Sequence, residues 1–405
     1  MLERSLQSVR GHISGRATEL VSVVLSHFCR RRVVQDPHLS FSTRTRLSPY
    51  FEATGAAGAK AFTVYNKMLM PTVYKSAIED YWPIINAVSM WDVAVERQVE
   101  LKGPDAFTLA TLMTPRDLSK TKIGQCKYVP LCNEYGGIVN DPVLLRLADD
   151  HFWLSIADSD VLLWAMGLAK GLGLDVECTE PDVSPLAIQG PLADDVAADL
   201  FGDWVRELKF FWFREFDFDG IPLVVARSGW SKQGGFELYL RDRAFGTELW
   251  ERVEAAGQPH GIQPGAPSSM ERIEGGLLSY GNDMTIRNNP FEVGLDRYCA
   301  LDQEADFLAK DALREIRDQG PIQRQIGITI AGEPIGGNAQ WWNVVDNDGQ
   351  RVGTVTSACH SPRLDQNIAL SVMDMEHQTI GTSVVVEMGA GETRTGTLTE
   401  LPFIS

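Results

Sequence analysis

The chain has 405 residues, of which 44% are hydrophobic and 22% are charged, and its formal net charge at pH 7 is −17. This composition is typical of a folded, soluble protein with two or three domains, and it excludes a disordered or fibrous chain. The negative net charge argues against nucleic acid or an anionic membrane surface as the main partner, because both are polyanions.

The first 47 residues differ in charge from the remainder. They hold eight arginines against three acids, a balance of +5 that leaves −22 for the rest of the chain. An Arg- and Ser-containing start resembles a weak organelle presequence. A dispensable extension, disordered or produced by a misassigned start codon, agrees with the composition at least as well. We expect the folded region to begin near Ser48.

The cysteines predict neither a metal site nor a disulfide framework. Six of them are spread along the chain without CxxC spacing, and the separation of Cys126 and Cys132 fits no common zinc pattern. Reduced thiols in a cytoplasmic protein are the expected state. No apolar run approaches the roughly 18 residues that a membrane helix needs, so we expect no membrane partner.

From residue 49 onward the residue pattern predicts two rounds of strands and helices. The first round has strands at 98–101, 127–131, 138–147, 152–156 and 175–179, and helices at 104–112 and 158–169. The second has strands at 184–188, 210–218, 223–227 and 236–240, and helices at 191–200 and 244–256. Each round resembles a split βαβ unit.

After residue 320 the pattern changes to short apolar runs separated by Gly turns, which predicts a compact all-β domain. Its expected strands are 325–330, 341–345, 352–357, 368–373 and 383–388. Neither a P-loop nor a strand-linked GxGxxG is present, which disfavours a nucleotide cofactor. The motif GxSxG is also missing, and no histidine stands in an obvious triad.

The segment RSGWSKQGGFELYL at 227–240 predicts a Gly-punctuated hairpin that carries Trp230, Glu237 and Tyr239. An indole face attracts cations, and a phenol donates to carboxylates. Together they suggest a site for a small molecule that is positive at one end and negative at the other. Taken alone, the same aromatic residues are better explained by simple packing of a hairpin, because Trp and Tyr are common in strands for packing reasons.

Three other segments hold polar residues in apolar surroundings. Asp141 follows a double-glycine turn, where its carboxylate either orients a ligand or accepts hydrogen bonds from the backbone amides of the turn. The segment 271–281 alternates charge with apolar residues, for which a structural network is the simpler reading. Lys60 is isolated among small and aromatic residues, and such a lysine is more often solvated than bound to a ligand.

Five motifs in order, GGIVND, RSGWSKQGGFE, ERIEGGLLSYG, NPFEVGLD and TSACHSPRLDQNIAL, resemble the glycine-cleavage T-protein family of folate-dependent methyl and aminomethyl transferases. The resemblance covers about 48–405. It implies an α+β fold of three domains in a ring: two split-βαβ domains and an all-β C-terminal domain, with folate in a central channel.

The resemblance also implies domain boundaries. Residues 48–312 would form the folate- and substrate-binding region, with two interleaved domains. These comprise about 48–98 with 183–265, and 99–182 with 266–312. The C-terminal β domain would span 313–405. Residues 1–47 would remain an extension outside the fold.

Within the family, the chain is similar to the subgroup that demethylates dimethylsulfoniopropionate. The similarity lies in the segments VERQVELKGPDA, LMTPRDLSK and IADSDVLLWA, and in Trp230, where T-protein typically has Tyr. That subgroup implies methyl transfer from the sulfonium to N5 of tetrahydrofolate, giving methylthiopropionate and 5-methyltetrahydrofolate. Such chemistry mainly requires alignment of the reacting atoms and exclusion of water.

The residue roles follow from the same resemblance. Trp230 would hold the sulfonium, and Lys60 and Tyr239 the substrate carboxylate. Glu237 would recognise the N–H groups of the pterin, which a carboxylate can accept in parallel. Asp141 would lie near the reacting nitrogen, as a proton acceptor or relay or only as an orienting group.

Tyr128 would line the folate cavity. Two positions depart from the family pattern: Phe62 lacks the hydroxyl of some relatives, and Lys67 stands where a neutral residue or His is expected.

Several alternatives stay open. An indole also binds ammonium groups, so a methylated amine such as glycine betaine or dimethylglycine is an alternative substrate. A folate-binding relative without turnover is a second alternative. A lipoyl-dependent aminomethyl transferase fits less well, because the sequence of the hairpin differs from the one typical of T-protein. The oligomeric state is also open, with a homodimer among the possibilities.

Overall fold

The computed structural model describes residues 42–389 and 391–404. The prediction that residues 1–47 are an extension outside the fold therefore concerns residues that lie almost wholly outside the described part of the chain. Arg46, at its edge, is already attached to the fold: its N–H donates to the Lys67 carbonyl at 2.7 Å, and its own carbonyl accepts from Leu69 at 3.1 Å. Within the described part, no helix combines the length and apolar character that crossing a membrane requires.

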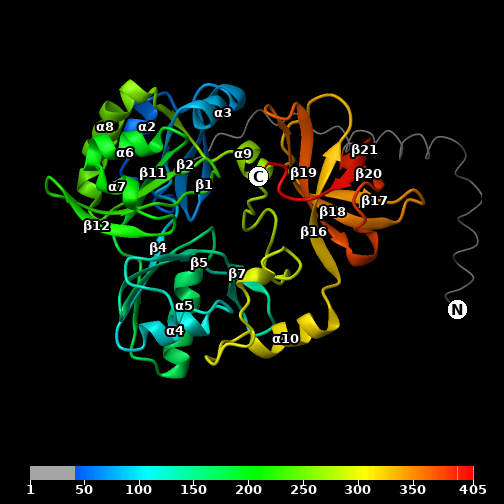
Figure 1. The fold of residues 1–405 in the computed structure, drawn as a ribbon, viewed down its shortest axis with the longest axis horizontal. Coiled ribbons are helices and arrows are strands. Elements are labelled where there is room, and N and C mark those ends of the chain that lie inside the picture. The colour runs from blue at the N-terminus through cyan, green and yellow to red at the C-terminus, as the bar shows by residue number, and fades with distance from the viewer. Residues whose placement is uncertain (1–41, 390, 405) are drawn as a thin grey trace, which may run out of the picture. The chain divides into compact units, whose positions relative to one another are not determined.

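A six-stranded sheet carries the hairpin that the sequence singled out (Figure 1). In spatial order its strands are β12 (Phe213–Phe218), β13 (Ile221–Ala226), β14 (Gly235–Leu240), β11 (Ser184–Gln189), β3 (Ser89–Asp92) and β15 (Gln263–Gly265). Apolar side chains of α2 (Phe51–Ala56), α6 (Ala193–Phe201), α7 (Trp204–Glu207) and α8 (Gly246–Gly257) pack with the strands in one core.

A five-stranded sheet forms the second layer of the candidate site. Its strand order is β10 (Glu177–Thr179), β4 (Gln98–Lys102), β9 (His151–Ser155), β8 (Val143–Ala148) and β5 (Cys126–Tyr128). The helices α4 (Ala106–Leu112) and α5 (Val161–Leu172) share a buried core with these strands. Leu109 and Ala165 of the helices lie in this core with Phe152 of β9.

The two sheets pack through a separate apolar cluster. Tyr239 and Val224 of the six-stranded sheet lie in that cluster with Leu145 and Trp153 of the five-stranded sheet. Side chains alternate between the faces of a strand, so β14 directs Phe236, Leu238 and Leu240 into the helix-covered core and Glu237 and Tyr239 toward the other sheet. The space between the sheets is therefore where the hairpin places its polar groups.

The C-terminal region is a closed six-stranded barrel, as the sequence predicted for an all-β domain. Its strands are β16 (Gln323–Ile330), β19 (Gln366–Asp374), β18 (Arg351–Ser361), β17 (Trp342–Val345), β20 (Ser383–Gly389) and β21 (Glu392–Thr399). The short helix α9 (Ser269–Glu274) packs on β18 and β19. The mixed sheets, helices and barrel confirm the predicted α+β class.

The remaining elements connect these layers. They are the hairpins β1 (Ala61–Tyr65) with β2 (Met68–Val73) and β6 (Leu131–Cys132) with β7 (Ile138–Asn140), and the helices α3 (Ala77–Asn86) and α10 (Lys310–Gln319). Single-turn 3₁₀ helices are η1 (Arg243–Phe245), η2 (Gln258–His260), η3 (Asp296–Tyr298) and η4 (Met375–His377). The sequence analysis did not predict ten of these helices and strands: β1, β2, β3, β15, β21, α2, α3, α7, α9 and α10.

Two predicted elements were wrong in detail. The expected strand 138–147 is two strands, because Pro142 has no N–H to donate and the chain changes partners there, from β6 to β5 and β9. The expected helix 158–169 begins at Val161 and continues to Leu172, past Gly171. It ends where Gly173 adopts φ +69°.

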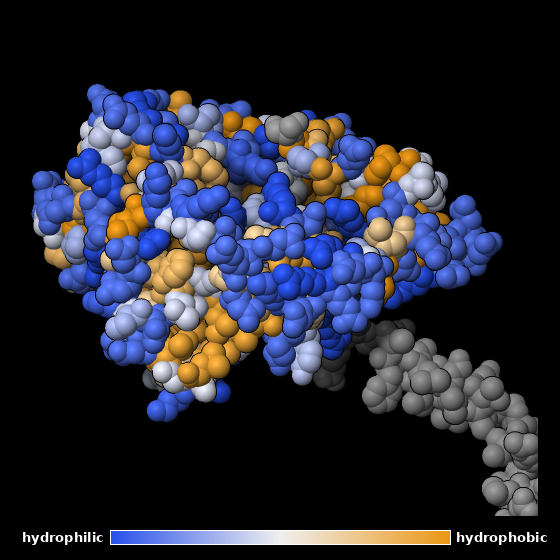
Figure 2. All heavy atoms as spheres, turned by 60° about the horizontal axis from the view of Figure 1, so that its bottom comes forward, coloured by the Kyte–Doolittle hydropathy of each residue, from blue (hydrophilic) through white to orange (hydrophobic). Residues whose placement is uncertain are grey.

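The outer face of α5 is unusually apolar. Leu163, Met166 and Leu172 are 65%, 47% and 55% exposed. Figure 2 shows a largely hydrophilic face with several groups of apolar atoms, of which a large one lies at the lower left. An exposed apolar patch is typical of a contact surface. The homodimer nevertheless stays a prediction.

Candidate active site

The loop 227–234 between β13 and β14 has a defined conformation set by Gln189 at the end of β11. The Gln189 amide donates to the Ser228 carbonyl at 3.1 Å and accepts from the Ser231 hydroxyl at 2.7 Å. Gly229 lies directly against that side chain with φ +147°, and a Cβ there would come within 2.1 Å of it. Glycine is therefore required, and the loop holds Trp230 between two fixed serines.

Glu237 on β14 is nearly buried, with 5% of its surface exposed. The Ser228 hydroxyl donates to its Oε2 atom, and the Tyr239 hydroxyl donates to the same atom at 3.1 Å. Burial raises the pKa of Glu237, while these two hydrogen bonds oppose the shift. Among the described residues, no hydrogen bond reaches Oε1, so half of this carboxylate is available to a ligand.

Asp141 lies where the chain leaves β7 and enters β8. The Tyr128 hydroxyl donates to its Oδ2 atom at 2.9 Å. Burial raises the pKa of Asp141 to about 7, the Tyr128 hydrogen bond lowers it, and the charge of Asp283 raises it further. A carboxyl group with this pKa is half ionised near neutral pH, which suits a group that accepts a proton during a reaction.

The neighbouring Asn140 fixes this turn. Its amide group donates to the Ala157 carbonyl at 3.0 Å and to the Ser159 hydroxyl at 2.9 Å, and its oxygen accepts from the Ala157 N–H at 3.1 Å. Asn140 is fully buried. Ser159, which we expected at a helix start, anchors this segment instead. Asp141 is therefore presented by a rigid backbone.

A third acid, Glu96, lies in the connection between β3 and β4. Burial raises the pKa of Glu96 well above its usual range, and the charges of Glu237 and Asp141 raise it further. The crossing of the chain from one sheet to the other thus brings three acids from distant segments together. Among residues 42–389 and 391–404, no group of three His, Cys, Asp or Glu side chains is arranged to hold a metal.

Trp230 is half-buried, and its position is set by two contacts. The indole N–H donates to the Leu278 carbonyl at 3.2 Å. The guanidinium of Arg272 lies over the indole ring, 5.6 Å from its centroid. One face of the ring is therefore already paired with a cation.

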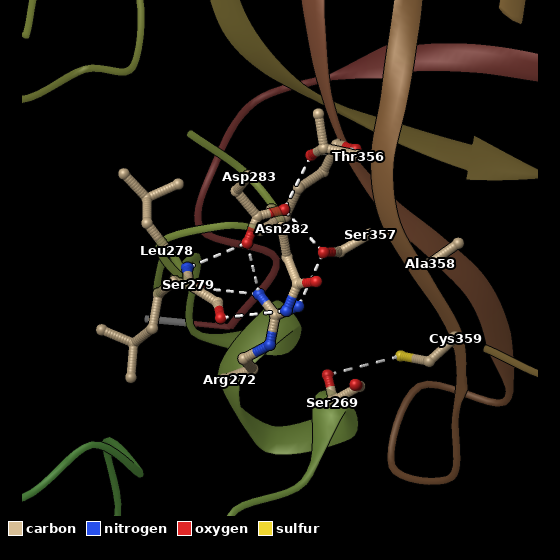
Figure 3. Close-up of polar contacts among 12 residues, drawn as sticks. Ser269, Arg272, Leu278, Ser279, Asn282, Asp283, Thr356, Ser357, Ala358 and Cys359 are labelled. Atoms are coloured by element: carbon tan, nitrogen blue, oxygen red, sulfur yellow. Dashed lines mark hydrogen bonds and ion pairs between the residues drawn. The ribbon is translucent and has the colours of Figure 1, made fainter. Parts of the chain in front are cut away.

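Arg272 belongs to a buried polar network that joins α9 to the barrel (Figure 3). It donates to Asp283 at 2.7 Å and to the Ser357 hydroxyl at 2.6 Å. Asp283 also accepts from Thr356 at 2.7 Å and from Ser357 at 2.6 Å. Arg272 of the segment 271–281 thus takes part in a structural network, which was the simpler of the two interpretations of this segment. The same network holds the guanidinium that lies over Trp230.

Two family descriptions match nearly the whole described chain. The GCVT N-terminal domain matches residues 50–303, and the glycine cleavage T-protein C-terminal barrel domain matches residues 323–404. The chain belongs to the glycine cleavage T-protein family. Its α+β fold with a C-terminal barrel is the T-protein fold that the sequence motifs predicted.

Known members of the T-protein family are similar to this chain over most of their length. The dimethylsulfoniopropionate demethylase DmdA of Ruegeria pomeroyi is 47% identical over 86% of this chain and 95% of its own. An aminomethyltransferase of Desulfitobacterium hafniense is 29% identical over 85% of this chain and 94% of its own. The crystal structure of the glycine cleavage system aminomethyltransferase T from Bartonella henselae superposes with a TM-score of 0.79 at 27% identity, covering 89% of this chain and 98% of that one.

The structure brings some of the predicted T-protein site residues together. Glu237 and Tyr239 are hydrogen-bonded to each other, as are Asp141 and Tyr128. Tyr239 is fully buried and directs its hydroxyl at Glu237. Trp230 approaches the loop at Leu278. The roles assigned to these residues stay predictions.

Lys60 stands apart from this group. It is exposed at the start of β1, and its ammonium donates to the Lys75 carbonyl at 2.9 Å. No hydrogen bond or ion pair within the described chain joins it to Trp230 or Tyr239. Lys67, one of the departures from the family pattern, pairs with Asp160 at 3.1 Å on the surface.

Glu96 is a candidate site residue that the sequence analysis missed. It stands in the phrase VERQVELKGPDA that carried part of the resemblance, so the motif contained the signal. A cavity of about 360 Å³ lies elsewhere, beside the turn before β7. Its lining includes Asn133, Tyr135 and Arg287 but neither Asp141 nor Glu237.

Proposed function

We propose that this protein is a tetrahydrofolate-dependent demethylase of dimethylsulfoniopropionate. The substrate assignment is supported by the 47% identity to the demethylase DmdA of Ruegeria pomeroyi. The observation that carries the chemistry is Asp141, a carboxyl group with a pKa near 7 held by Tyr128 beside two further acids. Membership of the T-protein family supports the coarser assignment, a folate-dependent transferase.

The reaction moves one methyl group. When bound, tetrahydrofolate supplies N5 as the nucleophile and accepts the methyl group. The carbon–sulfur bond breaks, its electron pair stays on sulfur, and the products are 3-methylthiopropionate, 5-methyltetrahydrofolate and one proton. No redox change occurs, and sulfur is already a good leaving group. The protein therefore has to align the reactants, exclude water and receive the proton.

Glu237 and Asp141 are the proposed contacts to the pterin. The free Oε1 atom of Glu237 can accept from an amino or ring N–H group, while Ser228 holds Oε2. Asp141 must be ionised to receive the proton from N5. Positive charge moves from sulfur toward nitrogen in this reaction, so a carboxylate near the nitrogen stabilises the transition state more than the ground state.

Trp230 is the proposed cation site. Arg272 covers one indole face, so the sulfonium would bind the opposite face, a contact of about 0.5–2 kcal/mol. Lys60 and Tyr239 are the proposed carboxylate ligands. For these roles the Lys60 ammonium would exchange the Lys75 carbonyl for the substrate, and the Tyr239 hydroxyl would turn from Glu237.

The test is an anaerobic assay of the purified protein with dimethylsulfoniopropionate and tetrahydrofolate. We expect methylthiopropionate and 5-methyltetrahydrofolate in equal amounts, with no product when either reactant is omitted. A folded protein that binds tetrahydrofolate and forms neither product would exclude the proposal and favour a folate-binding relative without turnover.

A methylated amine is the second candidate substrate, and the indole of Trp230 is the observation that favours it. An aromatic face attracts a sulfonium and an ammonium alike. Competition between dimethylsulfoniopropionate, glycine betaine and dimethylglycine in one assay separates the two. The proposal predicts that kcat/KM is highest for the sulfonium.

A further inference from the structure

Glu96 differs from the two other acids of the site, because its carboxyl group has no partner. The carboxyl groups of Glu237 and Asp141 each accept a hydrogen bond from a hydroxyl group. Within the described part of the chain, no hydrogen bond or ion pair reaches the carboxyl group of Glu96. Its backbone is bonded, since the N–H donates to the Val93 carbonyl at 2.9 Å and the carbonyl accepts from the Gln98 side chain at 2.8 Å. Glu96 is therefore fixed in place while its carboxyl group stays available to a ligand.

Hydrogen bonds to one carbonyl group bring Glu96 close to Asp141. The Asn66 amide donates to the Val95 carbonyl at 3.0 Å and to the Ala157 carbonyl at 3.3 Å. The residue directly before Asp141 donates to the same Ala157 carbonyl at 3.0 Å. The segments that precede the two acids therefore meet through the backbone, and not through flexible side chains.

The six-stranded sheet brings Glu237 to the same place. Ala187 of β11 pairs with Trp91 of β3 on one side and with Glu237 of β14 on the other. Side chains that lie opposite each other on neighbouring strands point to the same face of a sheet. Glu96 lies shortly after the end of β3. The charges of Glu237 and Asp141 accordingly act on Glu96, and they raise its pKa beyond the larger effect of burial.

No cation of the described residues pairs with these three acids. The guanidinium of Arg97, the next residue, donates to Glu180 at 3.3 Å and to three backbone carbonyls. The other groups that face Glu96 are the phenols of Tyr65 and Tyr239. Burial raises the pKa of both phenols, and the charges of nearby acids raise it further, so both are neutral at pH 7.

A fourth acid adds to the negative charge of this region. Asp158 accepts from the Asn66 N–H at 2.9 Å, and its charge also acts on Tyr65. Buried carboxyl groups this close together do not all ionise, so the group retains a proton. A cation bound among them would remove the repulsion and release that proton. A sulfonium has no N–H group, so an aromatic face and a counter-charge are the features that recognise it.

We propose that Glu96 is the counter-ion of the sulfonium group, and that binding of the cationic substrate displaces one proton from the three acids Glu96, Asp141 and Glu237. The proposal rests on the function proposed above and adds the residue that selects a positive charge. Release of the proton to solvent leaves Asp141 ionised once the substrate is bound. In that state Asp141 can receive the proton from N5 of the folate.

The test is calorimetry of dimethylsulfoniopropionate binding to the full chain at pH 7 without folate, so that no turnover occurs. Titrations in phosphate and in Tris count the released protons, because the two buffers differ in heat of ionisation. Wild type should release about half to one proton for each substrate bound. The probe 4-methylpentanoate has carbon in place of the sulfonium sulfur and carries no positive charge. It should bind at least about tenfold more weakly, without proton release.

Glu96→Gln should abolish the proton release. A cation that lowers the pKa of an acid by about 1–3 units binds about 10- to 1000-fold more tightly to the ionised acid, because such linkage is reciprocal. The variant should therefore bind dimethylsulfoniopropionate at least about tenfold more weakly than wild type at pH 8.5, and the difference should shrink at pH 5.5.

Glu271→Gln is the matched control. Glu271 is also buried, and burial raises its pKa to about 7, but its carboxyl group caps α9 together with Ser268. This variant should release as many protons as wild type. Equal release by wild type and Glu96→Gln, or no release by a wild type that binds the substrate, would overturn the role of Glu96 and leave the proposed function standing. A wild type that binds no sulfonium or ammonium substrate, with or without tetrahydrofolate, would contradict both.

Discussion

Replacing Tyr128 by Phe tests the assignment of Asp141 as the group that accepts the proton. The variant removes the hydroxyl that donates to Asp141 at 2.9 Å and lowers its pKa from what burial alone would give. A hydrogen bond to a charged group contributes about 1.5–3 kcal/mol, and one pKa unit corresponds to about 1.4 kcal/mol. We therefore expect the pKa of Asp141 to rise by at least about one unit.

The sign of the pH effect follows from the required charge state. Asp141 must be ionised to act, so kcat rises with pH through the pKa of this group, near 7 in wild type. After a shift of about one unit, the ionised fraction at pH 7 falls from about one half to about one tenth. At saturating folate and substrate, kcat should then fall about fivefold at pH 7 and be nearly unchanged at pH 9.

Tyr280→Phe is the matched control. Its hydroxyl donates to the Ile138 carbonyl at 3.1 Å, close to Asp141 but not to the carboxylate itself. The assay is kcat measured between pH 5.5 and 9.5 for wild type and both variants. An unshifted profile in Tyr128→Phe, or an equal shift in Tyr280→Phe, would refute the reasoning.

Three other substitutions have defined outcomes. Glu96→Gln should stabilise the protein at alkaline pH. The pKa of Glu96 is higher in the folded state than its value of about 4.5 in the unfolded state. The wild type therefore loses stability as the pH rises from the unfolded-state pKa through the folded-state pKa. The melting temperature of the variant relative to wild type should thus increase from pH 4.5 to 8, and a constant difference would contradict this. Arg272→Met should cost about 3–5 kcal/mol in urea unfolding, because it leaves Asp283 buried and unpaired, and Arg272→Met/Asp283→Leu should recover part of the loss. Trp230→Ala should raise the substrate KM about 2- to 30-fold while the tetrahydrofolate Kd stays the same, and equal loss of both would refute the cation–π role.

Local patterns were sufficient to predict much of the fold. The strand predicted at 236–240 is confirmed as β14, Gly235–Leu240, and the alternation of side chains along it puts Glu237 and Tyr239 on one face. The switch to short apolar runs with Gly turns predicted an all-β domain, and the structure shows that this domain is a closed barrel. Pro142 shows the limit of such patterns: the apolar run 138–147 reads as one strand, and only the tertiary ladder shows that the chain changes partners at Asp141.

Local patterns could not predict which segments distant in sequence lie close together in the fold. Glu96 lies in a connection with no periodicity, and its approach to Glu237 and Asp141 depends on how the chain crosses between the sheets. Trp230 was singled out from the sequence, but the guanidinium of Arg272 on its face was not foreseen.

A single-turnover experiment with methyl-labelled dimethylsulfoniopropionate tests the central claim most directly. Excess protein is mixed with tetrahydrofolate and substrate carrying ¹³C in its S-methyl groups, and the products are followed by NMR. The account predicts one labelled methyl group on N5 of the folate for each methylthiopropionate formed. Label that stays in the sulfonium while bound folate remains unmethylated, or that appears in a product other than 5-methyltetrahydrofolate, would contradict it.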